Sequence, residues 1–246
     1  METALSRNVR VLSDAEGVAH TGAQLFKSAA AVAISSRGRF SVALSGGSTP
    51  HRLYRMLGSA YRKRITWEQV HIFWSDERCV PADHEQSNFR QACEELISRI
   101  DIPDNNIHRI RGELAPEEAA KEYENALKKH FATDGMPRFD LVLLGIGEDG
   151  HTASLFPGAE TLSETERLAV PARSSQAGNW RVTLSLPVLN SAALVVFLVT
   201  GKTKAGIINE ILSKGTKDPY PAAAVSPHHG RIIWLLDEDA ASGIRQ

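Results

Sequence analysis

The sequence predicts an α/β fold: a doubly wound, mostly parallel sheet with helices on both faces, built by residues 1–246 as a single domain. Several short runs of consecutive apolar residues alternate little with polar ones, as is typical of strands buried on both faces. These expected strands lie at 40–44, 70–74, 139–144, 193–199 and 232–236. Segments with helical spacing separate them, and this alternation favours a parallel sheet. No repeat, low-complexity tract or linker interrupts the sequence.

The first expected helix spans 13–36, where Ser13 and Glu16 form an S-x-x-E capping box and Gly38 ends the helix. The remaining expected helices lie at 50–57, 87–99, 116–131 and 203–212. The pattern between 162 and 189 is less regular. It indicates two short strands, "LAVPAR" and "RVTLSL", separated by the loop "SSQAGN". The segment 174–180, "SSQAGNW", is a candidate mobile loop.

The composition excludes several classes of protein. The chain has 28 Lys and Arg against 29 Asp and Glu, a net charge of -1, and no basic stripe that would indicate nucleic acid or membrane partners. Cys79 and Cys93 are too few for a disulfide scaffold and lack metal-type spacing. No secretory leader or long apolar span is present, so a soluble, cytoplasmic protein is expected. Any recognition of an anion must therefore be local.

The polar motifs follow the expected strands. "SGGSTP" follows the first strand, "SDERCVP" the second, "GIGEDGH" the third and "TGKTKA" the fourth. In open parallel sheets, ligands bind outside the carboxyl ends of the strands, where loops from several βα units converge. We therefore expect the functional residues to meet at this edge.

"SGGSTP" is a candidate phosphate-binding loop. Thr49 is a natural N-cap with Pro50 as the first helical residue, and a helix N-terminus with free N–H groups binds phosphate. Walker A spacing and its lysine are absent, which indicates a monophosphate. A plain tight turn with a cap also accounts for Thr49 and Pro50, but it leaves Gly46 and Gly47 without a role, so phosphate binding by Gly46 to Thr49, including Ser48, is favoured.

"GIGEDGH" matches the dinucleotide motif G-x-G-x-x-G, but three features count against a dinucleotide. Glu148 and Asp149 would repel a pyrophosphate, Pro157 interrupts the segment where a long helix should continue, and no acid for a ribose follows about twenty residues on. His151 lies two residues from Asp149 and could act as a general base whose tautomer the carboxylate fixes. The alternative is a capping or core histidine.

The other charged motifs each have a plain alternative. The acidic and basic residues of "WSDERCVPADHEQSN" would ordinarily be a solvated face, except that a rigidly held Arg78 could bind a carboxylate or a developing oxyanion. Lys202 and Lys204 at a helix start oppose the macrodipole, which suggests an anion between them unless both are solvated.

A metal site is not expected. His84 with His71, or the pair His228 and His229, could in principle bind a metal, but none has ligand spacing with a carboxylate as third partner.

Taken together, the motifs resemble the 6-phosphogluconolactonases, within the glucosamine-6-phosphate isomerase/deaminase superfamily. The resemblance covers nearly the whole chain. It depends on the ordered motifs "LSGGSTP", "WSDERCVPADHEQSN", "DLVLLGIGEDGHTASLFPG", "RVTLSLPVLN" and "VTGKTKA".

The resemblance implies a Rossmann-like fold and hydrolysis of 6-phosphogluconolactone to 6-phosphogluconate, in the oxidative pentose phosphate pathway, without a metal or other cofactor. It implies that His151 activates water beside Asp149 and that Arg78 lies near the lactone carbonyl or the product carboxylate. Lys202 fits the pattern less clearly. The substrate phosphate would contact Gly46, Gly47, Ser48, Thr49, Arg181 and Lys204. The partner would be this small molecule, bound by a monomer or a weak homo-oligomer.

Two other functions remain open. One is a glucosamine-6-phosphate deaminase/isomerase with Asp76 as base, but the related deaminases continue from "GIGxDGH" with "IAFNEP", whereas this chain has "TASLFP" and lacks that glutamate. The other is a non-catalytic sugar-phosphate sensor. Such sensors normally follow a DNA-binding segment, whereas this sequence begins almost directly with the first expected helix.

Overall fold

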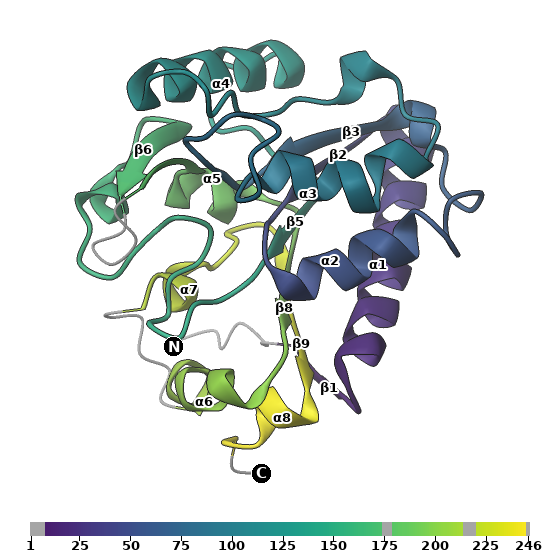
Figure 1. The fold of residues 1–246 in the computed structure, drawn as a ribbon, viewed down its shortest axis with the longest axis vertical. Helices are drawn as coiled ribbons and strands as arrows, with labels where there is room; N and C mark the ends of the chain where they lie inside the picture. The colour runs from purple at the N-terminus through teal and green to yellow at the C-terminus, as the bar shows by residue number, and fades with distance from the viewer. Residues whose placement is uncertain (1–7, 174–178, 214–219, 245–246) are drawn as a thin grey trace.

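The computed structural model describes residues 8–173, 179–213 and 220–244 and shows an α/β fold with a mostly parallel sheet (Figure 1). The main sheet has six strands in the order β1-β9-β8-β5-β2-β3, and every neighbouring pair is parallel. Its strands are β1 (Asn8–Leu12), β2 (Phe40–Leu44), β3 (Val70–Trp74), β5 (Leu141–Leu144), β8 (Leu194–Val199) and β9 (Arg231–Asp237). The predicted fold class is confirmed.

A second sheet of three antiparallel strands lies beside the first, in the order β4-β7-β6. Its strands are β4 (Asp76–Arg78), β6 (Ala169–Arg173) and β7 (Trp180–Leu184). The two short strands predicted in the irregular region are therefore present as β6 and β7. Most of the loop between them, predicted to be mobile, lies outside the described residues.

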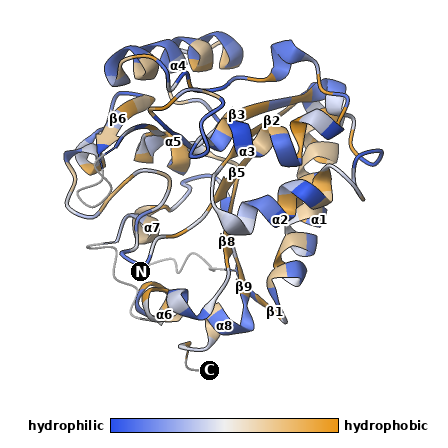
Figure 2. Cartoon of the chain, in the orientation of Figure 1, coloured by the Kyte–Doolittle hydropathy of each residue, from blue (hydrophilic) through white to orange (hydrophobic). Residues whose placement is uncertain are grey.

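Helices cover both faces of the main sheet, with α1 and α2 on one side and α4 and α5 on the other (Figure 1). The α-helices are α1 (Ala15–Arg37), α2 (Ser48–Leu57), α3 (Asn88–Glu95), α4 (Pro116–Phe131), α5 (Leu186–Ser191), α6 (Ala205–Ser213), α7 (Pro221–Ala224) and α8 (Glu238–Ala241). Figure 2 shows the strands mainly hydrophobic and the outer helices bearing hydrophilic residues. No helix among the described residues is long and apolar enough to span a bilayer.

Aromatic contacts join these layers. Phe26 of α1 packs edge-on against Phe40 of β2 with ring centroids 5.2 Å apart. Phe197 and Trp234, which are register partners on β8 and β9, stack at 3.9 Å with an interplanar angle of 3°. Both pairs are almost completely buried. Burial of large apolar side chains on both faces explains why these strands have continuous apolar sequences.

Two strands fall outside the predicted set. β1 is an edge strand whose residues are largely exposed, so it lacks an apolar run. β4 consists of three charged residues that pair with β7. The loop predicted to follow β3 is thus partly a strand.

Two predicted helix caps are wrong by one or two residues. Asp14, not Ser13, is the N-cap of α1, and its carboxylate accepts the N–H of Gly17 at 2.8 Å. The N-cap of α2 is Gly47, not Thr49, so Pro50 is the third helical residue. Gly38 ends α1 in the left-handed conformation, with φ of 73°, as predicted.

Two buried tyrosine hydroxyls fix the carboxyl ends of β2 and β3. The Tyr54 hydroxyl of α2 accepts the N–H of Ser45 at 3.0 Å and donates to the Ser45 carbonyl at 2.6 Å. The Tyr123 hydroxyl of α4 does the same for Trp74, at 2.9 and 2.7 Å. Each tyrosine therefore satisfies both backbone groups of one residue at the point where a polar motif begins.

Replacement of Tyr123 by phenylalanine should destabilise the protein, because it leaves the N–H and carbonyl of Trp74 buried without these partners. We expect the free energy of unfolding to fall by about 2 kcal/mol in urea denaturation. Tyr61 is a matched control because it is also buried, yet its hydroxyl makes no hydrogen bond to another described residue. An equal loss in Tyr61→Phe would contradict the role given to the Tyr123 hydroxyl.

Candidate active site

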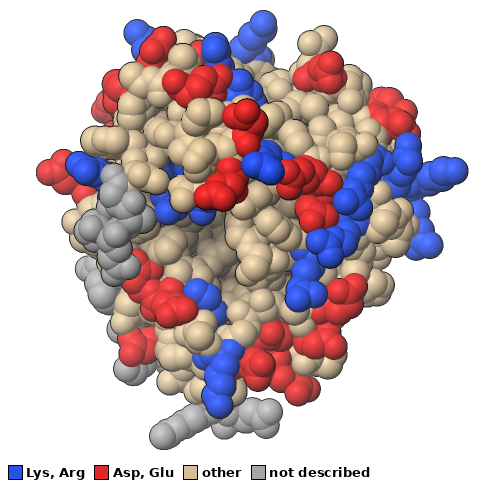
Figure 3. All heavy atoms as spheres, in the orientation of Figure 1, with Lys and Arg blue, Asp and Glu red and all other residues tan. Residues whose placement is uncertain are grey.

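A cavity of about 280 Å³ opens at the carboxyl edge of the main sheet. Figure 3 shows the hollow near the centre of this face, between the segments that carry α2 and α7 in Figure 1, with basic and acidic side chains around it. All four motifs that follow the predicted strands contribute to its lining. The lining includes 45–50, Asp76, Arg78, 145–147, 151–153, Arg181, Thr200 and Lys204. The predicted convergence of the polar motifs is confirmed.

His151 is oriented by Asp149. Its ring Nδ1 lies 2.6 Å from Asp149 Oδ1, and its backbone N–H donates to the same oxygen at 3.1 Å. This pairing assigns the proton to Nδ1 and leaves the Nε2 lone pair available, while the ring packs on Phe156 with centroids 4.9 Å apart. Burial alone would raise the pKa of Asp149, but the hydrogen bonds from His151 and the electrostatic interaction with its ring hold it below its usual value. His151 lines the cavity and Asp149 supports it from behind.

The middle glycine of "GIGEDG" makes room for this pair. A Cβ at Gly147 would overlap His151 Nδ1 and lie 2.5 Å from Asp149 Oδ1. The last glycine, Gly150, has a φ of 82°, which favours a residue without a side chain. The glycine spacing that resembles a dinucleotide motif therefore serves a histidine–aspartate pair.

The first turn of α2 forms one wall of the cavity. Its N-cap Gly47 has a φ of 109° and carries no side chain to cap the helix, so the N–H groups of the first turn lack a side-chain acceptor. Ser48 and Thr49 line the cavity at this point, and Thr49 Oγ1 lies 2.8 Å from Thr200 Oγ1. Thr49 is thus used to link α2 to the end of β8 rather than as the predicted cap. An uncapped N-terminus is suited to an anion.

Arg78 and Arg181 are opposite each other in the antiparallel pair of β4 and β7, and both line the cavity. Arg78 donates to the Gln86 carbonyl at 2.6 Å, and Arg181 approaches Ser154 Oγ at 3.4 Å and Asp76 at 3.9 Å. In both arginines the Nε is buried without a hydrogen-bond partner among the residues that the structure describes. Burial lowers the pKa of Arg181, Asp76 opposes this change, and the charge of Arg78 adds to it.

Asp76 and Glu77 are buried, so the prediction of a solvated charged face is wrong for these residues. Asp76 accepts from Ser154 Oγ at 2.7 Å, and Glu77 accepts the N–H groups of Asn88 and Phe89 at 2.7 Å each, at the start of α3. Burial raises the pKa of Glu77, although these hydrogen bonds act in the opposite direction. The two carboxylates anchor β4, the strand that carries Arg78. The partners named here, Ser154, Asn88 and Phe89, lie eleven or more residues away along the chain, so no local pattern could have revealed this role.

The structure separates the two candidate lysines. Both lie in the short 3-10 helix η5 (Lys202–Lys204), which precedes α6. Lys204 lines the cavity, with its Nζ 3.8 Å from Glu148 Oε1, whereas Lys202 is exposed and lies outside the lining. The geometry therefore gives no support to an anion held between them.

Comparisons with known proteins are consistent across sequence and structure. The family model described as "Glucosamine-6-phosphate isomerases/6-phosphogluconolactonase" matches residues 13–234. A 6-phosphogluconolactonase from Synechocystis is 42% identical over 217 residues, which cover 87% of this chain and 88% of the relative. The human 6-phosphogluconolactonase is 40% identical, with 95% and 92% covered. The solved structure of 6-phosphogluconolactonase from Thermotoga maritima matches with a TM-score of 0.82 and 33% identity, over 94% of this chain and 100% of that one. On this match of sequence and structure, the chain belongs to the glucosamine-6-phosphate isomerase/6-phosphogluconolactonase family.

Proposed function

We propose that this protein hydrolyses 6-phosphogluconolactone to 6-phosphogluconate. The observation that carries the proposal is that one cavity holds both an oriented imidazole, at His151, and an uncapped helix N-terminus, at Gly47. The first is suited to activating water and the second to binding phosphate. Relatives that cover most of the chain are named 6-phosphogluconolactonases, which supports the same substrate.

The phosphate group would hold the substrate in place. The backbone N–H groups of Ser48 and Thr49 provide neutral donors, and Lys204 and Arg181 provide charged ones. Arg78, Arg181 and Lys204 line the cavity together with one carboxylate, Asp76, so the lining carries an excess of positive charge. Charge-assisted hydrogen bonds of this kind give both affinity and orientation.

The chemical step would use His151 as a general base. Nε2 takes a proton from water as the water oxygen attacks the lactone carbonyl, and Asp149 stabilises the resulting imidazolium. Arg78, whose Nε has no hydrogen-bond partner in the described part of the chain, would stabilise the oxyanion. The tetrahedral intermediate then expels the ring oxygen, which takes the proton from His151 and leaves as a hydroxyl group. Arg78 would next face the product carboxylate.

The deaminase alternative is less well supported by the environment of its base. Asp76 is 5% exposed and accepts from Ser154, with Asn88 and Arg181 close by. A carboxylate engaged in this way is poorly placed to exchange protons with a substrate. A purely binding domain would not require the hydrogen bond that orients His151.

We further propose that both sheets work as a single domain, because residues from both line the cavity. We propose a monomer or a weak homo-oligomer that acts in the cytoplasm.

Removal of the His151 imidazole should slow turnover without weakening substrate binding. We expect His151→Ala to lower kcat by about 10²- to 10⁴-fold, which is the usual rate enhancement by a general base, with little change in KM. Acid release from fresh 6-phosphogluconolactone, corrected for spontaneous hydrolysis, gives both constants. His20, exposed on α1, provides the control variant His20→Ala. Unchanged kcat in His151→Ala would remove the base assignment.

The two lysines of η5 form a matched pair for testing the phosphate site. Lys204→Ala should raise KM for the phosphorylated lactone by about ten- to a hundredfold, because it removes a charged donor from the cavity. Lys202→Ala should leave KM unchanged. With unphosphorylated gluconolactone the two variants should behave alike. Equal effects of the two substitutions on the phosphorylated lactone would argue against phosphate binding by Lys204.

Gly147→Ala should disrupt the orientation of His151 without removing any functional side chain. The added methyl group overlaps the His151–Asp149 pair, so kcat should approach that of His151→Ala. Gly206→Ala is a suitable control because a Cβ there meets no atom within 4 Å. Full activity in Gly147→Ala would show that this close packing is not needed for catalysis.

A further inference from the structure

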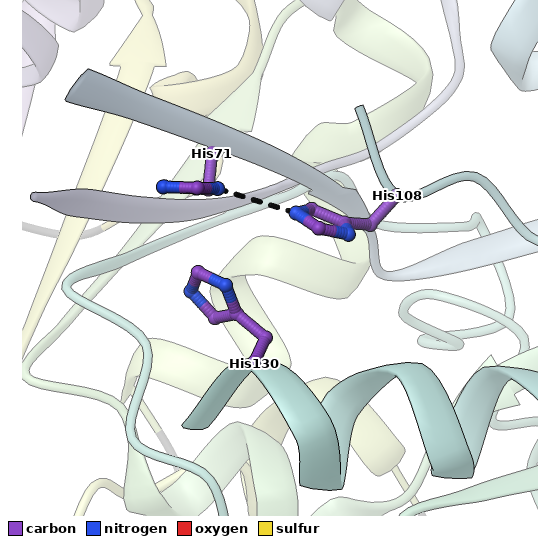
Figure 4. A group of neighbouring side chains, drawn as sticks. All are labelled: His71, His108 and His130. Carbon is purple, nitrogen blue, oxygen red and sulfur yellow. Dashed lines mark hydrogen bonds between the residues drawn. The ribbon is translucent and has the colours of Figure 1, made fainter. Parts of the chain in front are cut away.

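Three half-buried histidines lie together outside the active-site cavity (Figure 4). His71 lies on β3, His108 follows the 3-10 helix η3 (Asp104–Asn106), and His130 is in the last turn of α4. One nitrogen from each ring lies within 4.8 Å of the other two. None of the three lines the cavity. From the sequence alone, His71 could be paired as a metal ligand only with His84, because His108 and His130 are far from it along the chain.

We propose that His71, His108 and His130 bind a divalent late first-row transition-metal ion, such as Zn²⁺. Imidazole is a preferred ligand for zinc, copper and nickel, and three histidines with a water molecule complete a tetrahedral shell. The ion would join the edge strand β3, the segment after η3 and the end of α4. It would therefore stabilise the fold at this edge of the sheet and take no part in lactone hydrolysis.

The spacing of the first two rings fits such a shell. His71 Nδ1 lies 3.3 Å from His108 Nε2. Two nitrogens bound tetrahedrally at about 2.0–2.1 Å from zinc are themselves about 3.4 Å apart. A single proton now links the two rings, and a metal ion could replace it once each ring tilts so that its lone pair points at the ion rather than at the other nitrogen.

The third ring is positioned by a neighbouring hydroxyl. His130 Nε2 lies 2.8 Å from Ser41 Oγ, which leaves Nδ1 for a metal, and Figure 4 shows this ring directed toward the other two. A hydrogen bond to the second ring nitrogen fixes the tautomer of a metal-binding histidine. Ser41 is the register partner of His71, so the hydroxyl and that imidazole are held on adjacent strands. The 4.8 Å limit exceeds the spacing of a tetrahedral shell, so binding requires His130 to move inward.

The surroundings keep the rings in place and uncharged. His108 stacks on Phe73 with centroids 4.2 Å apart and an interplanar angle of 12°. Burial lowers the pKa of His108 to about 4 and that of His130 to about 3, and the neighbouring histidines add to both changes. Neutral imidazole is the form that binds metals. Arg39, whose charge also lowers the pKa of His71 and His130, opposes a cation, but it is exposed and therefore screened by solvent.

The test uses the full-length protein without a histidine tag, after treatment with a chelator. Titration with Co²⁺ alone should give visible d–d absorption that saturates at one equivalent, and Zn²⁺ should displace it. At a free Zn²⁺ concentration of about a hundred times Kd, the melting temperature should rise by about 5–10 °C. Lactone hydrolysis should be the same with and without Zn²⁺, so failure of this proposal would leave the proposed function standing.

Two variants remove single ligands while preserving local packing. His108→Phe retains a ring to stack on Phe73, and His130→Asn retains a polar group near Ser41. Each should weaken Co²⁺ binding by about tenfold or more. Should one variant fail to fold, the other still decides the question.

Controls separate this cluster from other ligands in the chain. His151→Ala removes the cavity histidine, and the double variant Cys79→Ser, Cys93→Ser removes both thiols. Metal binding should survive in each. Absence of tetrahedral Co²⁺ absorption in the unmodified protein, or equally tight binding in His108→Phe and His130→Asn, would overturn the proposal and leave the three rings as a hydrogen-bonded stack.

Discussion

Parallel strand pairing is the constraint on which the active site depends. Because β2, β5 and β8 run in one direction, the loops that follow them emerge at one edge of the sheet. β3 runs parallel to β2, and the tyrosines of α2 and α4 fix where the loops after these two strands begin, since each hydroxyl binds both backbone groups of a residue at the end of β2 or β3. The sheet supplies the common edge, and Tyr54 and Tyr123 limit the freedom of the chain that leaves it.

Close packing of backbone against side chain supplies the precision that loops would otherwise lack. Gly147 lets the His151–Asp149 pair lie directly over the backbone, and Gly46 lies against the amide of Asn88, where a Cβ would overlap Oδ1. Asn88 also donates to the Asp76 carbonyl at 2.9 Å, so the loop after β2 is held against β4. Both contacts leave little room for alternative loop conformations, and their cost is the intolerance of any side chain at these glycines.

Sequence reasoning succeeded where the signal was local and failed where it was not. Continuous apolar runs identified five strands of the main sheet because those strands are buried on both faces, whereas β1 is exposed at an edge and β4 is charged. The motif residues of the cavity were found because they follow strands directly. The burial of Glu77 depends on backbone donors from a distant helix start. Likewise, the cluster of His71, His108 and His130 exists only once β3 and α4 pack together.

The unpaired arginine nitrogens link the architecture of the site to its energetics. A buried donor without an acceptor costs about 1–3 kcal/mol, and Arg78 and Arg181 each carry one beside another positive charge. The fold tolerates this arrangement because Asp76, itself held by Ser154, partly offsets the charge of Arg181. Under the proposed function, Arg181 would face the substrate phosphate and Arg78 the lactone carbonyl, so each cation would meet a different group of the substrate. Negative charge on the carbonyl oxygen develops only as water attacks. Arg78 would therefore interact more strongly with that oxyanion than with the neutral carbonyl, which is the requirement for lowering a reaction barrier rather than merely binding a substrate.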